Sequence, residues 1–203
     1  MLLFLDVISS IPEFCVIDDN KVILQEKITK HETDRLSDNI IQSYIAIDKR
    51  LNLTKNLKKI STTIGPGSYT SLRVGSAFIS GLMISRKIPY YPLSIEDILN
   101  FNSEKFSKKN LGVFITSSNN QQFLCYKNKD KEMEYNKIEN NKCSVPKYIE
   151  LILFNKTKIN ENNKLEQIQF SFFKEFYKNY NNLTFKKNII IKPIYISNNQ
   201  LLN

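Results

Sequence analysis

Several residue types are scarce in this 203-residue chain, and each scarcity excludes a class of protein. Tryptophan is absent, and the single histidine, His31, cannot supply a site that needs two imidazoles, which excludes the HExxH zinc proteases. The three cysteines are odd in number and far apart, which excludes a disulfide scaffold and is typical of a reduced, cytoplasmic protein. The sequence has no run of about 18 apolar residues, so it predicts no membrane span.

Positive charge is abundant, and most of the excess lies in the second half. Residues 1–100 contain 12 Lys and Arg against 11 Asp and Glu, whereas residues 101–203 contain 17 against 9. A basic half attracts phosphate backbones. However, 25 of the 29 basic residues are Lys, and the chain is also rich in Asn and Ile, as AT-rich codons produce. The charge therefore permits nucleic-acid binding without indicating it.

Apolar patterns in the first hundred residues indicate alternating strands and helices. Short apolar runs predict strands at 2–5, 13–17, 22–28, 60–64 and 88–93. A helical period predicts a helix over 34–51, for which Thr33 or Asp34 is the candidate cap. A second helix is predicted over 68–86, and a third, capped by Ser94, runs to residue 101. This order is typical of a layered α/β fold.

The second half has weaker patterns. It predicts paired strands at 111–116 and 122–126, an edge strand near Met133, a short apolar element at 148–154 and a final strand at 189–191. Residues 165–180 show a helical period with a thick aromatic stripe, which predicts an amphipathic helix. Aromatic residues at this spacing are typical of a core, and base stacking is the alternative.

The most informative stretch is GPGSYTSLR at residues 65–73, between a predicted strand and a predicted helix. Its glycines permit a tight turn, and Ser68 or Thr70 can cap the helix. A helix start can also bind an anion. Because the stretch lacks the Walker A lysine and the Rossmann glycine spacing, a capped turn is favoured over a nucleotide cradle.

Small residues interrupt the helix predicted over 68–86. Gly75, Ala77 and Gly81 lie among larger apolar residues. Glycine within a helix costs about 1 kcal/mol relative to alanine, so these positions predict close approach by another backbone.

Two further residues have both a functional and a structural interpretation. Asp6 ends a predicted buried strand, where it either positions a nucleotide or cation or forms local hydrogen bonds. His31 next to Glu32 is interpreted as a surface or capping residue, and Ser68 and Ser71 lack a G-x-S-x-G elbow. The sequence therefore predicts no catalytic set.

Around residues 65–73 the chain resembles the TsaB (YeaZ-like) family of bacterial tRNA threonylcarbamoyladenosine synthesis. That family carries the motif G-x-G-P-G-S-[FY]-T-G-[LVI]-R, and the matching residues here are Gly65, Pro66, Gly67, Ser68, Tyr69, Thr70 and Arg73. The segment at 192–196 is similar to the family's closing P-x-Y-[LI]. Val7 and Ser71 depart from the family pattern. The resemblance covers residues 1–100 and the C-terminal segment.

The resemblance implies an actin/Hsp70/acetate-kinase-like (ASKHA) fold of two small α/β lobes with mixed sheets, here 1–101 and 102–203. It implies a cytoplasmic, non-catalytic scaffold that pairs with a TsaD-like transferase and is joined by a TsaE-like ATPase. The chain then needs no cofactor of its own, because ATP and metal belong to the partner subunits, and tRNA is reached through the complex. Whether the isolated chain forms a homodimer stays open.

The resemblance also implies a partner interface on the helices predicted over 34–51 and 68–86. The candidate interface residues are Leu36, Ile40, Tyr44, Ile47, Val74, Ala77, Phe78 and Gly81. Asp6 is the candidate remnant of a nucleotide site. Two alternatives remain: a small ATP-dependent kinase of the same fold that uses Asp6 and the Gly65 turn, and a stand-alone RNA-binding protein that uses the basic half and the aromatic stripe of 170–180.

Overall fold

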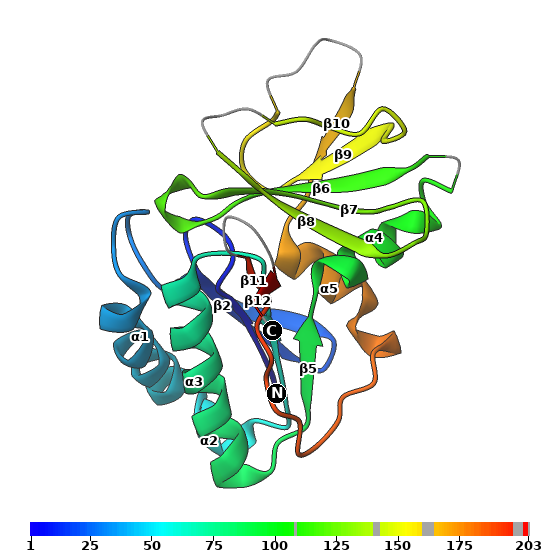
Figure 1. The fold of residues 1–203 in the computed structure, drawn as a ribbon. Coiled ribbons are helices and arrows are strands. Elements are labelled where there is room, and N and C mark those ends of the chain that lie inside the picture. The colour runs from blue at the N-terminus through cyan, green and yellow to red at the C-terminus, as the bar shows by residue number, and fades with distance from the viewer. Residues whose placement is uncertain (108, 140–142, 160–164, 197–200, 203) are drawn as a thin grey trace.

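Two mixed five-stranded sheets organise the chain, one in each half (Figure 1). The computed structural model describes residues 1–107, 109–139, 143–159, 165–196 and 201–202. The two sheets define two α/β lobes, which confirms the predicted fold class. The predicted division of the chain at residue 101 stays a prediction.

The first sheet has the strand order β3-β2-β1-β4-β5. Its strands are β1 (Leu2–Asp6), β2 (Glu13–Asp18), β3 (Lys21–Lys27), β4 (Lys59–Thr63) and β5 (Tyr90–Leu93). The first three strands form an antiparallel meander, and β4 and β5 extend the sheet in parallel to β1. All five residues of β1 are buried, as expected for a central strand covered on both faces.

The second sheet repeats this topology with the order β10-β9-β6-β7-β8. Its strands are β6 (Leu111–Thr116), β7 (Gln122–Lys127), β8 (Met133–Ile138), β9 (Leu151–Phe154) and β10 (Glu166–Gln169). Again a three-strand meander is extended by two parallel strands. The sequence shows no internal repeat, so this duplication is visible only in the strand pairing.

The helices are distributed unequally between the lobes. They are α1 (Leu36–Leu51), α2 (Leu53–Asn56), α3 (Tyr69–Arg86), α4 (Ile95–Ser103) and α5 (Phe172–Asn179), with the 3₁₀ turns η1 (Ser118–Asn120) and η2 (Tyr180–Asn182). In Figure 1, α1 and α3 cover the outer face of the first sheet. No helix of the described chain is long and apolar enough to cross a membrane.

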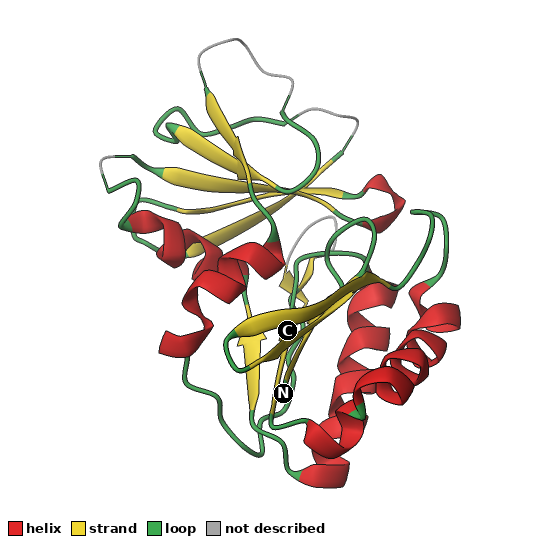
Figure 2. Cartoon of the chain, turned by 180° about the vertical axis from the view of Figure 1, so that it is seen from behind, coloured by secondary structure: helices red, strands yellow, loops and turns green. Residues whose placement is uncertain are grey.

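Helices α4 and α5 fill the space between the two sheets, as the view from behind shows (Figure 2). Although α5 follows the last strand of the second sheet, it packs on β1, where Phe176 stacks on Phe4 with ring centroids 4.7 Å apart. Conversely, α4 follows β5 of the first sheet and contacts β6 and β7 of the second. Asn102 on α4 donates a hydrogen bond to Glu175 on α5 (3.3 Å). This exchange of helices joins the lobes.

The C-terminal segment returns to the first lobe. Lys186 forms an isolated bridge with Tyr90 of β5, and the Ile194 N–H donates to the Ile64 carbonyl (2.7 Å). The predicted strand at 189–191 is wrong, because this stretch runs along the first lobe without regular pairing. The two strands at this end are the short β11 (Tyr195–Ile196) and β12 (Leu201–Leu202).

Two further expectations need correction. The helix predicted over 165–180 is strand β10 followed by α5, because its first residues pair with β9 and the Ser171 hydroxyl caps the helix by accepting the Lys174 N–H. Helix α1 starts at Leu36 without a side-chain cap, because the Asp34 carboxylate instead accepts the backbone N–H groups of Lys30 and His31. Ser94 does cap α4, in a capping box with Asp97.

Candidate functional site

The turn between β4 and α3 carries the GPGS residues of the sequence motif. Gly65 has φ of +113°, and a Cβ there would lie 2.6 Å from the Ile194 carbonyl oxygen, so only glycine fits. Because the Ile194 N–H also donates a hydrogen bond to the Ile64 carbonyl, the C-terminal segment packs directly against this turn. The two stretches that carry the family resemblance are therefore in direct contact.

The same contact continues along the first turn of α3. The rings of Tyr69 and Tyr195 lie 4.9 Å apart, and the Arg73 guanidinium lies 5.1 Å from the Tyr69 ring. Tyr69 is nevertheless 52% exposed. The predicted cap is wrong: Ser68 occupies the N-cap position, but neither its side chain nor that of Thr70 caps the helix. The buried Ser68 instead lines a cavity.

This cavity, of about 370 Å³, is the cleft between the lobes. Its walls come from the start of α3, from the segment before α1 and from η1 of the second lobe; they include Ser68, Thr70, Ser71, Ser118 and Asn119. The hydroxyls of Ser71 and Ser118 lie 3.3 Å apart across it. The lining combines hydroxyl groups with the charged side chains of Glu32, Asp34 and Arg35, so the cleft is polar.

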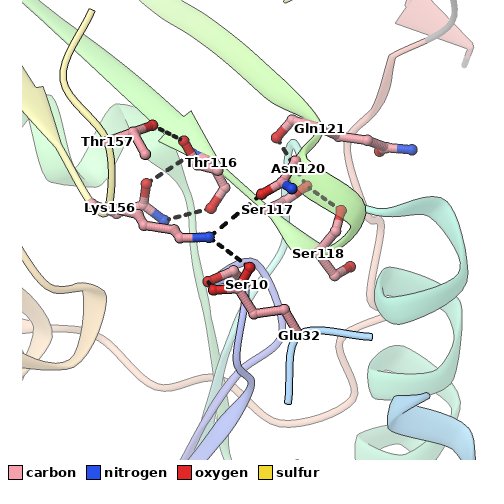
Figure 3. Close-up of polar contacts among 10 residues, drawn as sticks. Ser10, Glu32, Thr116, Ser117, Ser118, Asn120, Gln121, Lys156 and Thr157 are labelled. Atoms are coloured by element: carbon pink, nitrogen blue, oxygen red, sulfur yellow. Dashed lines mark hydrogen bonds and ion pairs between the residues drawn. The ribbon is translucent and has the colours of Figure 1, made fainter. Parts of the chain in front are cut away.

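An ion pair between the lobes lies beside this cleft (Figure 3). Lys156, after β9, donates to Glu32 (2.6 Å) and to the Asn120 amide oxygen (3.4 Å), and the Ser10 hydroxyl donates to Glu32 (3.2 Å). The Lys156 hydrogen bond holds the pKa of Glu32 below its usual value. Sequence reasoning missed this pair, because its members are 124 residues apart.

Asp6, the candidate remnant of a nucleotide site, is 2% exposed and fully hydrogen-bonded. Its carboxylate accepts the N–H groups of Ile8 (2.9 Å) and Ser9 (3.2 Å) and the hydroxyls of Ser9 (2.6 Å) and Thr63 (3.1 Å). Burial raises its pKa against the lowering effect of these bonds. Of the two interpretations that the sequence left open, the structure shows the local hydrogen-bonding role, which ties the end of β1 to β4.

The two glycines within α3 have different surroundings. A Cβ on Gly75 would lie 2.6 Å from Cγ1 of Val7, so the absence of a side chain is required by packing inside the protein. A Cβ on Gly81 would meet no atom of the described residues within 4 Å. The sequence predicted that another backbone approaches this helix closely. At Gly75 the neighbour is Val7 of the same chain, whereas the described residues provide no such neighbour at Gly81.

The predicted interface residues divide into two groups. Leu36, Ile40, Tyr44 and Ile47 are at most 8% exposed, because they form the face of α1 that packs on the first sheet. They are core residues and cannot present a surface to a partner. On α3, Ala77 and Gly81 are exposed, whereas Val74 and Phe78 are half-buried; Phe78 packs against Phe14 and Tyr44 (5.8 and 5.2 Å between ring centroids).

Besides Tyr69 at the start of α3, the large apolar side chains that α1 and α3 expose are Ile41 (51%), Ile45 (41%) and Ile84 (81%). Sequence reasoning placed Ile41 and Ile45 beside the apolar stripe without assigning them to the outer face. Together with Ala77 and Gly81 they form what we call the α1–α3 face, on the two helices that lie side by side in Figure 1.

The described residues provide few reactive groups. Burial raises the pKa of the Cys15 and Cys125 thiols, which disfavours the nucleophilic thiolate. No group of three His, Cys, Asp or Glu side chains in the described ranges is placed to hold a metal ion. The stripe at 170–180 is core rather than a stacking surface, because Phe172, Phe173 and Phe176 are at most 3% exposed.

Comparisons with known proteins give one family and one fold. The family model of TsaD, tRNA N6-adenosine threonylcarbamoyltransferase, matches residues 26–192. Among curated proteins, none matches the sequence significantly.

The solved structures that the chain resembles are of the YeaZ type. A crystal structure described as an uncharacterized protein with similarity to peptidase YeaZ from Pseudomonas aeruginosa matches with a TM-score of 0.55 and 14% identity, over 97% of this chain and 99% of that one. YeaZ from Pseudomonas aeruginosa matches with a TM-score of 0.50 and 14% identity, over 75% and 74% of the two chains. At this identity the likeness establishes the two-lobed fold.

Proposed function

Because the chain belongs to the family of TsaD, the tRNA N6-adenosine threonylcarbamoyltransferase, we propose that it is a companion subunit of such a transferase in the cytoplasm. In this proposal the chain pairs with a TsaD-like subunit through the α1–α3 face and activates it. The partner then transfers the threonylcarbamoyl group to the adenosine of tRNA, with a TsaE-like ATPase as a third component.

The α1–α3 face is the observation that carries this proposal. Glycine in an exposed helix costs about 1 kcal/mol relative to alanine, and no contact within the described chain requires Gly81. Exposed Ala77 lies one turn before it, and Ile84 is 81% exposed on the same helix. A small-residue stripe beside exposed isoleucines suits the close approach of a helix from another chain.

The proposal assigns the chemistry to the partner. The Asp6 carboxylate already accepts four hydrogen bonds, and the two buried thiols are held protonated. The occupied carboxylate supports a scaffold rather than the kinase alternative, in which Asp6 and the Gly65 turn hold ATP, and the protonated thiols argue against a cysteine nucleophile. Hydrolysis of ATP by the isolated chain would favour the kinase.

The test is threonylcarbamoylation of tRNA by the TsaD-like subunit of the same genome, with and without this chain. We expect activity to depend on the chain and to be lost with Ala77→Arg or Gly81→Arg. Both positions are exposed, so the variants keep their fold, whereas a charge at Phe78 would disturb the core contact with Phe14 and Tyr44.

The matched control is Ile190→Arg, which places the same side chain at an 80% exposed position outside the α1–α3 face. It should support full activity. Equal activity of all three variants, each confirmed as folded by circular dichroism, would refute the proposed interface. A TsaD-like subunit that is fully active alone would refute the proposed function.

A further inference from the structure

A second cavity lies at the outer end of the second lobe, between the end of α4, the start of β6 and the β7–β8 turn. Its volume is about 450 Å³. In Figure 1 these elements lie on the side of the molecule opposite to α1 and α3. The cavity is therefore separate from both the α1–α3 face and the cleft between the lobes.

Four lysines line this cavity, and none of its other described lining residues is Asp or Glu; the lysines are Lys109, Lys127, Lys129 and Lys131. Two of them are neutralised at the rim, Lys109 by Glu166 and Lys127 by Glu96 (2.9 Å). Within the described part of the chain, Lys129 and Lys131 have no acidic partner. Two lysines of the cavity are thus free of ion pairs with the described residues, although Asp130 and Glu132 alternate with them on the same turn.

The turn that carries these two lysines is held by Asn128. Its side-chain oxygen accepts the N–H groups of Asp130 (3.0 Å) and Glu132 (2.9 Å), and its carbonyl accepts the Lys131 N–H (3.0 Å). The positions of Lys129 and Lys131 are thereby fixed relative to the rest of the cavity, which reduces the ordering cost of binding an anion.

The remaining lining offers groups that recognise a base. Tyr148 lies in the wall, held edge-to-face by Tyr126 with ring centroids 6.2 Å apart. Leu99 and Leu111 add apolar surface, and Asn100 is one of three asparagines that add amide groups. Proteins bind single-stranded nucleic acid with this combination: cationic side chains contact the phosphates, and an aromatic ring stacks on a base.

We propose that this cavity binds an unpaired stretch of RNA, with Lys129 and Lys131 on its phosphates and Tyr148 stacked on one base. The choice of RNA over DNA rests on the proposed function in tRNA modification. A free nucleotide shares this chemistry, and competition by AMP distinguishes it from a strand. The excess of lysine in the second half thereby acquires a defined site.

The test measures binding of a short labelled single-stranded RNA by the full isolated chain, by fluorescence anisotropy over a range of salt concentrations. For Lys129→Glu/Lys131→Glu we expect weaker binding and a salt slope reduced by roughly 1.4, since each phosphate contact on a single strand contributes about 0.7. Tyr148→Ala should weaken binding about 5- to 100-fold, and Tyr148→Phe should keep it, because stacking needs only the ring.

The matched control is Lys187→Glu/Lys192→Glu, which changes the net charge equally at two exposed positions outside the cavity. Equal weakening by both double variants, or an unchanged affinity of Tyr148→Ala, would overturn the proposal. So would AMP that competes as well as the RNA, or tighter binding of the matching DNA. Every cavity variant should still pair with the TsaD-like subunit. If the wild-type chain does not pair with that subunit, the result counts against the proposed function and leaves the RNA-binding cavity untouched.

Discussion

The two lobes have one strand topology but differ in what covers their outer faces. In the first lobe, the crossovers β3–β4 and β4–β5 contain α1 and α3, and these helices cover the sheet. In the second lobe, the described residues of the corresponding connections, β8–β9 and β9–β10, contain no helix. Loop side chains such as Ile149 and Ile159 cover Phe114 and Phe154 instead. Among the described residues, helices therefore cover an outer face in the first lobe and not in the second.

The lobes also secure the ends of their central strands by different groups. At the end of β1, the buried carboxylate of Asp6 accepts the hydroxyl of Thr63, at the end of β4. At the corresponding end of β6, the hydroxyl of Thr116 lies 2.6 Å from that of Thr157, just after β9. The second lobe thus keeps the tie between neighbouring parallel strands but replaces the charged group by a neutral one.

The largest predicted effect comes from the helix that joins the lobes. Phe176 on α5 is fully buried and stacks on Phe4 of the first sheet. Phe176→Ala should lower the free energy of unfolding by about 3–5 kcal/mol in a single transition, because it leaves a cavity between the lobes. Denaturant unfolding followed by circular dichroism measures this, with the exposed Ile190→Ala as the control. Two separate transitions in the wild type would show that the lobes fold independently.

The second prediction compares the two strand ends. Asp6→Ala should cost roughly 2–3 kcal/mol, since it leaves buried N–H groups of the loop after β1 without an acceptor. Thr116→Val removes one hydroxyl contact and should cost about 0.5–1.5 kcal/mol. Asp6→Asn keeps one acceptor oxygen and should recover most of the loss in the same unfolding assay. A cost of Asp6→Ala no larger than that of Thr116→Val would contradict the structural role of this carboxylate.

The third prediction compares the two glycines of α3. Gly75→Ala should destabilise the protein by about 1–3 kcal/mol, because the new Cβ lies 2.6 Å from Val7. Gly81→Ala should instead stabilise the isolated chain by up to about 1 kcal/mol, since the added methyl group meets nothing and improves helix propensity. Thermal unfolding of the two variants checks the signs. A destabilising Gly81→Ala would remove the argument that this glycine serves a partner.

The smallest effect is expected for the ion pair between the lobes. Lys156 lowers the pKa of Glu32, so the folded carboxylate binds its proton less tightly than the unfolded one. The ion pair stabilises the folded protein fully above pH 4.5, the usual pKa of a glutamate. This contribution is lost as the pH falls through the lower pKa that Glu32 has in the folded protein. Because both side chains are about one-third exposed, Glu32→Gln should cost at most about 1 kcal/mol at neutral pH. Unfolding curves of wild type and variant should converge in acid; a constant difference would exclude the ion pair as its cause.

Sequence reasoning predicted the first lobe better than the second for a physical reason. The first lobe has strong apolar periods and sharp turns, so the ranges of α1 and α3 and the capping by Ser94 were close to the structure. In the second lobe, Leu165 and Ile168 continue the helical spacing of Phe172 and Phe176. The predicted helix therefore included residues that form strand β10 in the structure. Pairing with β9 decides this local conformation, and no local pattern records it.

The candidate site was predicted only in part. The resemblance at residues 65–73 predicted the family, which the family match confirms. The apolar period of α1 marks the residues that pack inward, so it selected Leu36, Ile40, Tyr44 and Ile47 although an interface needs the opposite face. Glu32, the acidic partner of Lys156, and Thr63, which donates to Asp6, each lie more than 50 residues away in sequence, and only the folded chain brings them together.

We propose that the helices of the first lobe make this chain a companion of a TsaD-like transferase. The most direct test is the native mass of the chain mixed with the TsaD-like protein of the same genome, at micromolar concentration, by light scattering after size exclusion. We expect a one-to-one complex that Gly81→Arg abolishes and Ile190→Arg preserves. Two separate species in the wild-type mixture would contradict it.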